Sequence, residues 1–415
     1  MAAQVESKVV SFEEARRLVE ERSSLVGPQG RELVSLLEAA GRVLAEPIVA
    51  DRDFPPFPRA TRDGYAVRSR DLESLPASLD VVGEVKAGGQ WQEAGPLQPG
   101  RTYAIMTGAP VPEGADAVVM LEHTVRSGER IQLARSVAAG ENLVARAAEA
   151  EAGQELLRPG TLLDPAAIAL AAAVGRARLS VFAKPRVAVL ATGDELVDLE
   201  TEPGPNQIRN SNSYSLAAQI LATGAVPVRL PIAPDEPQRL RELLRQGMES
   251  DLLLISGGVS LGKYDLVELE LAELRAEFFF TGAQIQPGRP IVFGQFPRPS
   301  REIPHHFFGL PGNPISTMVT YELFARPMVE ALSGRQLTKL RFVYAKLKTE
   351  IRTKTGLRRF LPAKLSGEFE HAEVELVRWQ GSGDAAALAR SNVYLVVAPD
   401  RERIAAGEWV PLVLR

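Results

Sequence analysis

The sequence predicts a multidomain chain of the α/β plus β class, in which a doubly wound parallel-sheet domain is joined to a mainly β domain and a small C-terminal β-barrel. Three observations support this fold class. The chain has 415 residues, enough for about three domains of roughly 150 residues. Short β-type runs alternate with helical patterns over residues 185–335, which is typical of parallel strands covered by helices. Short β-type runs separated by glycine, proline and charged residues fill much of the remainder.

The composition excludes several classes of protein. Apolar residues make up 45% of the chain and charged residues 24%, as in ordinary globular domains. The 52 acidic and 48 basic residues give a net charge of −4, which disfavours a nucleic-acid partner. The absence of cysteine excludes disulfides, zinc ribbons, iron–sulfur ligation and a cysteine nucleophile. The four histidines form no HxxxH pair, so any metal is expected to have oxygen ligands, as Mg²⁺ does.

The apolar runs in the sequence are too short to predict a signal peptide or a membrane-spanning helix, so no membrane partner is expected. The first residues are polar and include no apolar stretch of signal-peptide length. The longest apolar runs, 168–175 and 252–256, are far shorter than the roughly 20 residues that span a bilayer. We therefore expect a cytoplasmic protein.

Two helices are expected at the start of the chain. Ser11 and Glu14 have the spacing of a capping box, which predicts a helix from Ser11 to about Ser23. A second helix is expected over about 31–40, stopped by Gly41. With residues 147–184, this part is predicted to form an N-terminal linking domain of helical and mixed structure, residues 8–49 and 147–184.

The linking domain is interrupted by a mainly β domain, residues 50–146. Proline and glycine recur there between short β-type runs, and residues 118–137 have the pattern of a hairpin. After this domain, Asp164 and Pro165 predict the N-cap and first position of an alanine-rich helix.

The α/β domain is expected over residues 185–335. Its predicted strands are 186–191, 226–232, 251–256 and 305–310. Its predicted helices are 213–223, 236–249, 265–275 and 314–333. Ligands of such sheets bind beyond the carboxyl ends of the strands. Residues 336–415 then turn β-rich and are predicted to form the barrel.

Glycine-rich and acidic loops follow the predicted strands. The loops are T-G-D-E at 192–195, A-P-D-E at 233–236, S-G-G-V-S-L-G-K-Y-D at 256–265 and P-G-N-P-I-S at 311–316. Glycine lets backbone N–H groups approach a ligand closely, and a helix N-terminus favours an anion. These loops predict a site for a phosphate-bearing ligand at one edge of the sheet.

Four carboxylates are predicted at the same edge: Asp194, Glu195, Asp235 and Asp265. Carboxylates beside a phosphate suit a bound Mg²⁺. The alternative is that each acid only caps a helix. A P-loop is disfavoured, because the Gly257-x4-Gly262-Lys263 pattern is followed by Tyr264 where Ser or Thr would hold Mg²⁺.

Together, the loops resemble one known family. The segments IMTGAPVPEGADAVVM, VLATGDELV, NSNSY, SGGVSLGKYD, PGRP and FGLPGNPIS occur in the family's order, and the likeness extends from about residue 8 to 415. The sequence resembles the molybdopterin molybdenumtransferases, the MoeA or gephyrin E-domain family.

The resemblance implies an activity and an assembly. Members insert molybdenum from molybdate into adenylylated molybdopterin with release of AMP, in a Mg²⁺-dependent step of molybdenum cofactor biosynthesis. They are elongated homodimers, and the α/β domain, which binds the pterin, forms a cleft with the β domain of the other subunit. The resemblance also implies that the first helix packs on the α/β domain. A possible partner is the adenylyltransferase that supplies the substrate.

The resemblance also implies roles for individual residues. The implied catalytic residues are Asp63, Glu195, Asp235, Asp265 and Glu149, with Asp265 and Glu195 as metal ligands. The implied substrate-binding residues are Thr107, Thr192, Gly193, Asp194, Ser256, Gly257, Gly258, Ser260, Gln286, Arg289, Pro311, Gly312, Asn313, Pro314, Ser316 and Ser382.

Several positions depart from the family pattern. Residues 58–62 read P-R-A-T-R where D-N-S-A-M is usual, and Glu149 replaces an aspartate. Gln286 and Arg289 stand where the family has lysines, and Pro362 stands where it has an arginine. We expect either that Arg358 or Arg359 takes the place of the missing arginine or that both face solvent.

Two alternatives to the enzyme stay open. The same fold serves as a non-catalytic scaffold dimer, although a scaffold need not keep four carboxylates. The changed cationic positions also leave room for tungstate as the oxyanion, since both oxyanions are tetrahedral dianions of similar size.

Overall fold

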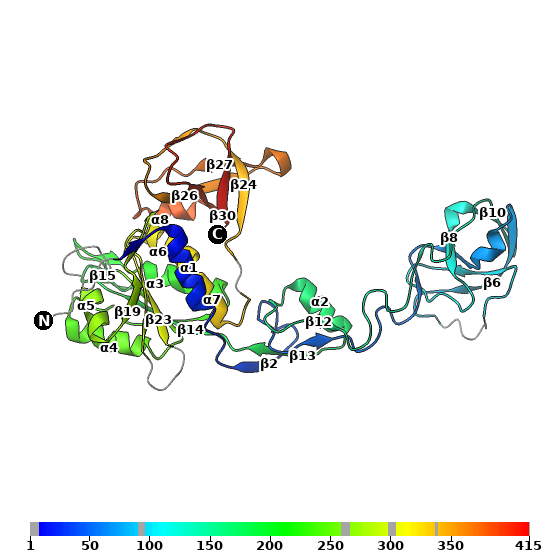
Figure 1. The fold of residues 1–415 in the computed structure, drawn as a ribbon, viewed down its shortest axis with the longest axis horizontal. Coiled ribbons are helices and arrows are strands. Elements are labelled where there is room, and N and C mark those ends of the chain that lie inside the picture. Colours follow the sequence, from blue (N-terminus) through cyan, green and yellow to red (C-terminus); the bar gives the residue numbers. More distant parts are fainter. Residues whose placement is uncertain (1–7, 90–95, 259–265, 298–303, 337–338, 415) are drawn as a thin grey trace.

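The structure, a computed structural model, describes residues 8–89, 96–258, 266–297, 304–336 and 339–414. Figure 1 shows an elongated molecule, with the α/β domain and the C-terminal barrel at one end and the β domain at the other. The linking domain lies between them. The multidomain α/β plus β class predicted from the sequence is confirmed.

The α/β domain is built on one six-stranded sheet in the order β17-β14-β18-β23-β22-β19. Its strands are β14 (Arg186–Ala191), β17 (Val226–Arg229), β18 (Leu252–Ser256), β19 (Glu277–Phe280), β22 (Val292–Phe296) and β23 (His305–Leu310). The first four strands in the order are parallel, but β22 and β19 are antiparallel to their neighbours. The sheet is therefore mixed rather than wholly parallel. Residues 297–304 are too few for the crossover of about a dozen residues that a parallel β22–β23 pair needs.

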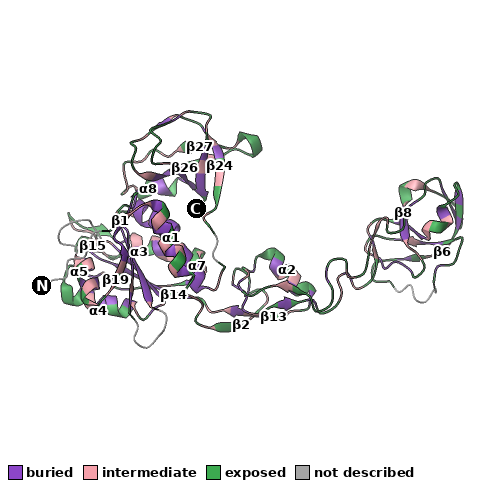
Figure 2. Cartoon of the chain, in the orientation of Figure 1, coloured by how far each residue is buried: buried purple, intermediate pink, exposed green. Residues whose placement is uncertain are grey.

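Helices cover both faces of this sheet. They are α3 (Asn212–Ala222), α4 (Pro237–Gly247), α5 (Leu266–Glu273), α6 (Pro314–Thr320) and α7 (Arg326–Leu332). Alternate residues of β14 enter opposite cores: Val187 packs with α3, and Ala188 packs with α4 and α5. Figure 2 shows the buried strands between exposed outer helix faces.

The predicted helix over 314–333 is divided. Residues Tyr321–Ala325 form a π-helical turn between α6 and α7. Pro327, the second residue of α7, has no N–H to donate within the helix, which accounts for the irregular turn before it.

The first helix, α1 (Phe12–Ser23), packs on the α/β domain as expected. Ser11 Oγ accepts the Glu14 N–H at 3.1 Å, which confirms the predicted N-cap. Phe12, Ala15 and Val19 are buried in the same core as α3 and α7. Phe12 also contacts Phe360 of the barrel, with ring centroids 5.2 Å apart.

The predicted second helix over 31–40 is wrong. Residues Arg31–Ser35 form β2, which pairs antiparallel with β13 (Arg178–Phe182). After β2 the chain turns, and the Glu38 carboxylate accepts the Ser35 N–H at 3.0 Å. Pairing with a strand distant in the sequence has overridden a helix-like spacing of leucines.

The rest of the linking domain surrounds α2 (Pro165–Ala173). Asp164 Oδ1 accepts the Ala167 N–H at 2.8 Å, as the N-cap prediction requires. The short strands β3 (Ile48–Val49) and β12 (Glu155–Leu157) pair beside it. Leu44, Leu163 and Leu179 contribute to one small core, so this domain is a compact connector between the two ends of the molecule.

The β domain contains a six-stranded sheet in the order β8-β5-β7-β6-β10-β9. Its strands are β5 (Gly64–Val67), β6 (Ala77–Val85), β7 (Arg101–Ile105), β8 (Ala117–Met120), β9 (Thr124–Ser127) and β10 (Arg130–Leu133). The predicted hairpin over 118–137 is shorter, because a 3-10 turn at Leu121–His123 separates β8 from the β9–β10 hairpin. Beside the sheet, β4 (Arg59–Ala60) pairs with β11 (Leu143–Val144).

The C-terminal domain is the predicted barrel. Its strands are β24 (Phe342–Leu347), β26 (Arg358–Ser366), β27 (Glu373–Leu376), β28 (Val393–Val397) and β30 (Trp409–Leu414). Pairing between β26 and β28 closes the ring. The short strand β21 (Ile285–Gln286) of the α/β domain adds to the outer side of β26.

Within the described ranges, each helix is too short or too polar to cross a lipid bilayer.

Candidate active site

A cavity of about 600 Å³ lies at the carboxyl ends of β14, β18 and β23. The loops after these three strands line it with Thr192, Glu195, Leu196, Ser256, Gly257, Gly258, Pro311, Gly312, Asn313 and Pro314. Ile208, Pro290 and the residues leading into α3 add to the lining, as do Gly383 and Ala385 of the C-terminal domain. The structure thus brings together three of the four loops that the sequence placed at this edge.

Glycines let the loops meet closely. Gly257 and Gly258 have φ of +94° and +64°, a conformation that favours glycine. A Cβ on Gly257 would lie 2.7 Å from the carbonyl oxygen of Thr192. A Cβ on Gly258 would lie 2.4 Å from Val267 Cγ2. Part of the cavity is consequently lined by backbone, which allows a ligand to approach it.

Asn212, the first residue of α3, connects two of the loops. Its Nδ2 donates to Ser256 Oγ at 2.9 Å and to the Gly312 carbonyl at 2.6 Å. These bonds fix the amide so that only Oδ1 is left to accept. The NSNSY segment contributes to the family resemblance, but no role for Asn212 was predicted, because only the folded chain shows that it borders the cavity.

Two buried polar atoms on the cavity lining have no hydrogen-bond partner among the described residues. They are Asn212 Oδ1 and Thr192 Oγ1. A buried polar atom without a partner costs free energy, so native proteins rarely leave one unpaired. The two atoms are available to a ligand that brings hydrogen-bond donors.

The acidic residues after β14 and β17 differ in their surroundings. Glu195 lines the cavity. Its carboxylate packs against Gly193 so closely that a Cβ on Gly193 would lie 2.2 Å from Glu195 Oε2. Gly193 has φ of +134° and leaves room for this carboxylate. Asp194 Oδ1 instead accepts the Asp235 N–H at 3.0 Å and ties the two loops together. Asp194 and Asp235 do not line the cavity, and their roles in the reaction stay predictions.

The described residues contain no group of three or more His, Asp or Glu side chains placed to hold a metal. Glu195 is the carboxylate on the cavity lining. Asp265 and Ser260 lie outside the described residues.

The C-terminal domain reaches the cavity through the loop that contains Ser382. The Ser382 carbonyl accepts the Ile315 N–H at 3.0 Å, which holds this loop against the start of α6. Ser316 is buried in α6.

Gln286 lies exposed in β21, and the Arg289 carbonyl accepts the Ala283 N–H at 3.0 Å. Their side chains are not part of the lining, although Pro290, next to Arg289, is.

Neither Arg358 nor Arg359 lines the cavity, and the role predicted for one of them at the anion site stays a prediction. Arg358 forms an ion pair with Glu13 and lies over the Phe12 ring at 5.4 Å. Arg359 is buried and donates to the Lys354 carbonyl. Arg358 thus connects the barrel to α1, whereas Arg359 bonds within the C-terminal domain and does not face solvent.

The predicted residues of the β domain lie at the other end of the molecule. Asp63 Oδ1 accepts the Thr107 N–H at 2.7 Å and the Thr107 hydroxyl at 2.8 Å. These hydrogen bonds, the backbone one first, hold the pKa of Asp63 below its usual value. Glu149 forms an ion pair with Arg59 at 2.8 Å. The linking domain separates this group from the cavity of the same chain (Figure 1).

Three segments of the chain match family models of known proteins. Residues 10–175 match the model of the MoeA N-terminal region (domain I and II), and residues 344–414 match the MoeA C-terminal region (domain IV). Residues 188–331, which supply most of the cavity, match a probable molybdopterin binding domain. A molybdopterin molybdenumtransferase of Nostoc sp. is 40% identical over 74% of this chain and 70% of its own length. The chain belongs to the molybdopterin molybdenumtransferase family.

Other members of the molybdopterin molybdenumtransferase family match more of the chain. Molybdopterin molybdenumtransferase 1 of Mycobacterium tuberculosis is 32% identical over 91% of this chain and 93% of its own length. A crystal structure of the molybdopterin biosynthesis moeA protein from Pyrococcus horikoshii has a TM-score of 0.78 at 32% identity. It covers 98% of this chain and 100% of that one. The family resemblance inferred from the motifs is confirmed.

Proposed function

We propose that this protein is a molybdopterin molybdenumtransferase, an enzyme that inserts molybdenum from molybdate into adenylylated molybdopterin with release of AMP. The observation that carries this proposal is the cavity at the strand ends, which lies in the part of the chain matching a molybdopterin-binding domain. The reaction belongs to molybdenum cofactor biosynthesis. A cytoplasmic location goes with it and stays a prediction.

The lining suits a pterin that carries a phosphate. A pterin ring presents N–H donors, and Asn212 Oδ1 and Thr192 Oγ1 are buried acceptors without partners among the described residues. Asn212 also begins α3, an 11-residue helix whose N-terminus favours a negative charge. Arg209 adds a positive side chain to the lining nearby. We assign the ring to the two acceptors and the phosphate to the start of α3.

Mg²⁺ is proposed as the cofactor. Mg²⁺ in proteins commonly binds one or two carboxylates together with substrate phosphates, and Glu195 offers one carboxylate on the lining. The described residues therefore fit a substrate-completed site, with Asp265 as the second predicted ligand. When bound, Mg²⁺ neutralises the charge of the phosphate.

A homodimer is proposed because one chain separates two sets of predicted site residues. Asp63 and Thr107 lie in the β domain, and Glu149 of the linking domain pairs with Arg59 of the β domain. All three are remote from the cavity of their own chain (Figure 1). Leu33 and Leu37 of the linking domain are 65% and 81% exposed, and a second copy would cover such a surface. In the dimer, the β domain of one subunit completes the cavity of the other.

The test is a direct assay of the reaction. The purified full-length protein is incubated with adenylylated molybdopterin, Mg²⁺ and molybdate, and AMP and molybdenum-containing pterin are measured. The proposal requires both products to form together and AMP release to stop without molybdate. Binding of the pterin without AMP release would instead support a scaffold, and release driven better by tungstate would support the tungstate alternative. Pull-down with the adenylyltransferase tests the proposed supply of substrate.

A further inference from the structure

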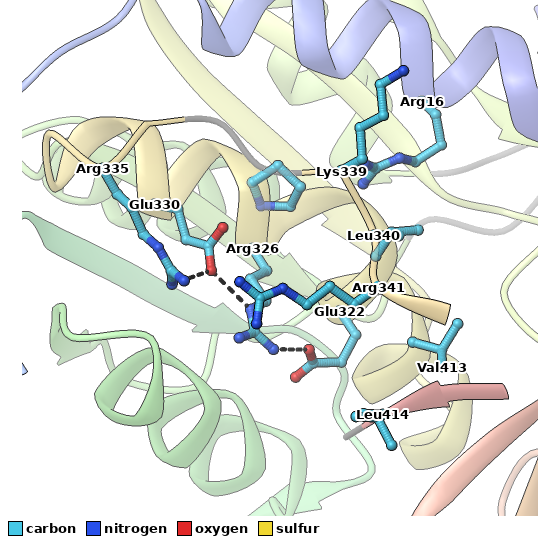
Figure 3. A pocket seen from close by; sticks show the side chains of 11 residues that line it. Arg16, Glu322, Arg326, Glu330, Arg335, Lys339, Leu340, Arg341, Val413 and Leu414 are labelled. Carbon is cyan, nitrogen blue, oxygen red and sulfur yellow. Dashed lines mark hydrogen bonds and ion pairs between the residues drawn. The ribbon is translucent and has the colours of Figure 1, made fainter. Parts of the chain in front are cut away.

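A second cavity lies on a different part of the α/β domain. This basic recess, of about 250 Å³, is bounded by α1, the π turn, α7, the link to the barrel and the end of β30 (Figure 3). It shares no lining residue with the cavity at the strand ends. The function proposed above makes no use of it.

Positive side chains dominate the basic recess. Its lining includes two carboxylates, Glu322 and Glu330, and five cationic residues, Arg16, Arg326, Arg335, Lys339 and Arg341. The whole chain has a net charge of −4, so this local excess of positive charge runs against the general charge of the molecule.

The two carboxylates are already engaged. Glu330 accepts from Arg326 at 3.2 Å and from Arg335 at 2.9 Å. Glu322 accepts from Arg326 at 2.8 Å and from Gln219 at 2.8 Å. Both are buried, which strengthens these pairs and removes the carboxylates as partners for further cations.

Lys339 and Arg341 are the cations left over. Neither forms an ion pair with any residue that the structure describes. Figure 3 shows Arg341 beside Arg326, and Lys339 beside Arg16. Arg16 is itself buried, donates to the Leu323 carbonyl and pairs with Glu20 at 2.6 Å. The recess therefore has two neighbouring groups of positive charge.

We propose that the basic recess binds a small polyanion, a molecule with at least two phosphate or carboxylate groups. Arg341 and Lys339 are its direct ligands, each beside a second arginine that strengthens the local field. Arginine presents several N–H donors in a fixed fork that matches phosphate and carboxylate oxygens. A cavity of about 250 Å³ suits a diphosphate or a tricarboxylate rather than a larger molecule.

Binding there has a mechanical consequence. The walls come from the α/β domain, from the link at residues 339–341 and from β30 of the barrel. A polyanion in the recess would hold the barrel against the α/β domain. The barrel also supplies Gly383 and Ala385 to the other cavity, so the two sites are connected through one domain.

The test is calorimetric titration of the full-length protein with inorganic pyrophosphate and, separately, with citrate at equal ionic strength. We expect at least one of them to bind with a dissociation constant below about 1 mM. Which one binds tells phosphate from carboxylate as the preferred group. Binding of neither would overturn the proposal.

Variants locate the binding. We expect Arg341→Ala to weaken it about tenfold and Lys339→Ala with Arg341→Ala to abolish it. The matched control, Lys348→Ala with Arg352→Ala, removes the same charge from exposed barrel residues and should leave the affinity unchanged. Equal weakening by the control would mean general electrostatic attraction and would overturn the proposal. Loss of binding in Asn212→Ala would place the anion in the strand-end cavity and would overturn it as well.

Discussion

The α/β domain and the β domain each hold part of the predicted site, but they solve different problems. The α/β domain forms a cavity from glycine loops and leaves two buried acceptors, Asn212 Oδ1 and Thr192 Oγ1, without partners among the described residues. In the β domain, the Asp63 carboxylate is exposed and already bonded to Thr107. One region is built to enclose a ligand, and the other to present a fixed carboxylate. This difference is what the proposed homodimer requires, because an exposed carboxylate can act on a ligand held by another subunit.

The largest expected effect comes from substituting one predicted catalytic residue in each of the two domains and then mixing the two variants. Asp63→Ala and Glu195→Ala should each lower AMP release by about 10²-fold or more, since each removes a predicted catalytic group. Mixing the two variants after dissociation should restore about a quarter of wild-type activity, because half of the reassembled dimers then hold one intact site. The measurement is AMP release before and after mixing. No recovery despite proven subunit exchange would mean that the two residues do not share a site across subunits.

A smaller but sharper effect is expected from Thr192→Val. The substitution keeps the side-chain shape and removes Oγ1, a buried atom without a partner among the described residues. Pterin affinity should fall about fivefold, which corresponds to about 1 kcal/mol, one ordinary hydrogen bond. The melting temperature should stay the same or rise, because an unpaired hydroxyl is removed.

The control for this substitution is Thr102→Val in the β domain. Thr102 is buried too, but its hydroxyl donates to the Ala66 carbonyl at 2.8 Å. This variant should lose stability and keep pterin affinity. If Thr192→Val destabilised the protein as much as Thr102→Val, Thr192 Oγ1 would have a structural partner.

Two glycines with nearly the same backbone provide a further comparison of the regions. Gly258 at the cavity has φ of +64°, and Gly128 in the β9–β10 hairpin has φ of +63°. A Cβ at Gly128 meets nothing within 4 Å, whereas one at Gly258 lies 2.4 Å from Val267 Cγ2. Gly128→Ala should cost about 1 kcal/mol from backbone strain alone, and Gly258→Ala more, about 2–3 kcal/mol. Denaturant unfolding of both variants measures the difference, and equal losses would mean that Val267 gives way.

The smallest effect concerns pH. The pKa of Asp63 lies below its usual value because Thr107 donates to it, so the carboxylate stabilises the fold above that value and the stabilisation is lost as pH falls through the lowered pKa. Thr107→Val removes the hydroxyl donor. Its melting temperature should be slightly below wild type at pH 6 and should converge with wild type in acid, as the Asp63 carboxylate becomes protonated. A difference that persisted in acid would assign the loss to packing rather than to the charge.

The loops that depend on local chemistry were predictable from the sequence. A strand followed by T-G-D-E or P-G-N-P must turn at the sheet edge, so Thr192, Gly257 and Asn313 were placed correctly on one cavity. The caps at Ser11 and Asp164 are likewise decided by residues three apart.

The features that depend on distant pairing were not predictable. Residues 31–35 form a strand only because Arg178–Phe182 lie beside them, which no local pattern reports. Asn212 reaches the cavity because its amide bridges Ser256 and Gly312, residues from two other loops. Arg358 had the right charge to serve the anion site, but Glu13, distant in the sequence, engages it elsewhere.

The α/β domain and the barrel are separate in the sequence, but strand β21 joins them in the structure. Ile285 and Gln286 pair with Arg358 and Arg359, so a segment of one domain completes the sheet of the next. Removal of residues 336–415 would leave these backbone groups as an unpaired edge and would uncover Phe12, which packs on Phe360. The truncated protein should therefore self-associate. In the intact chain the two domains should melt in a single transition. During synthesis, β21 can complete its pairing only after the barrel residues that follow it have been made and folded.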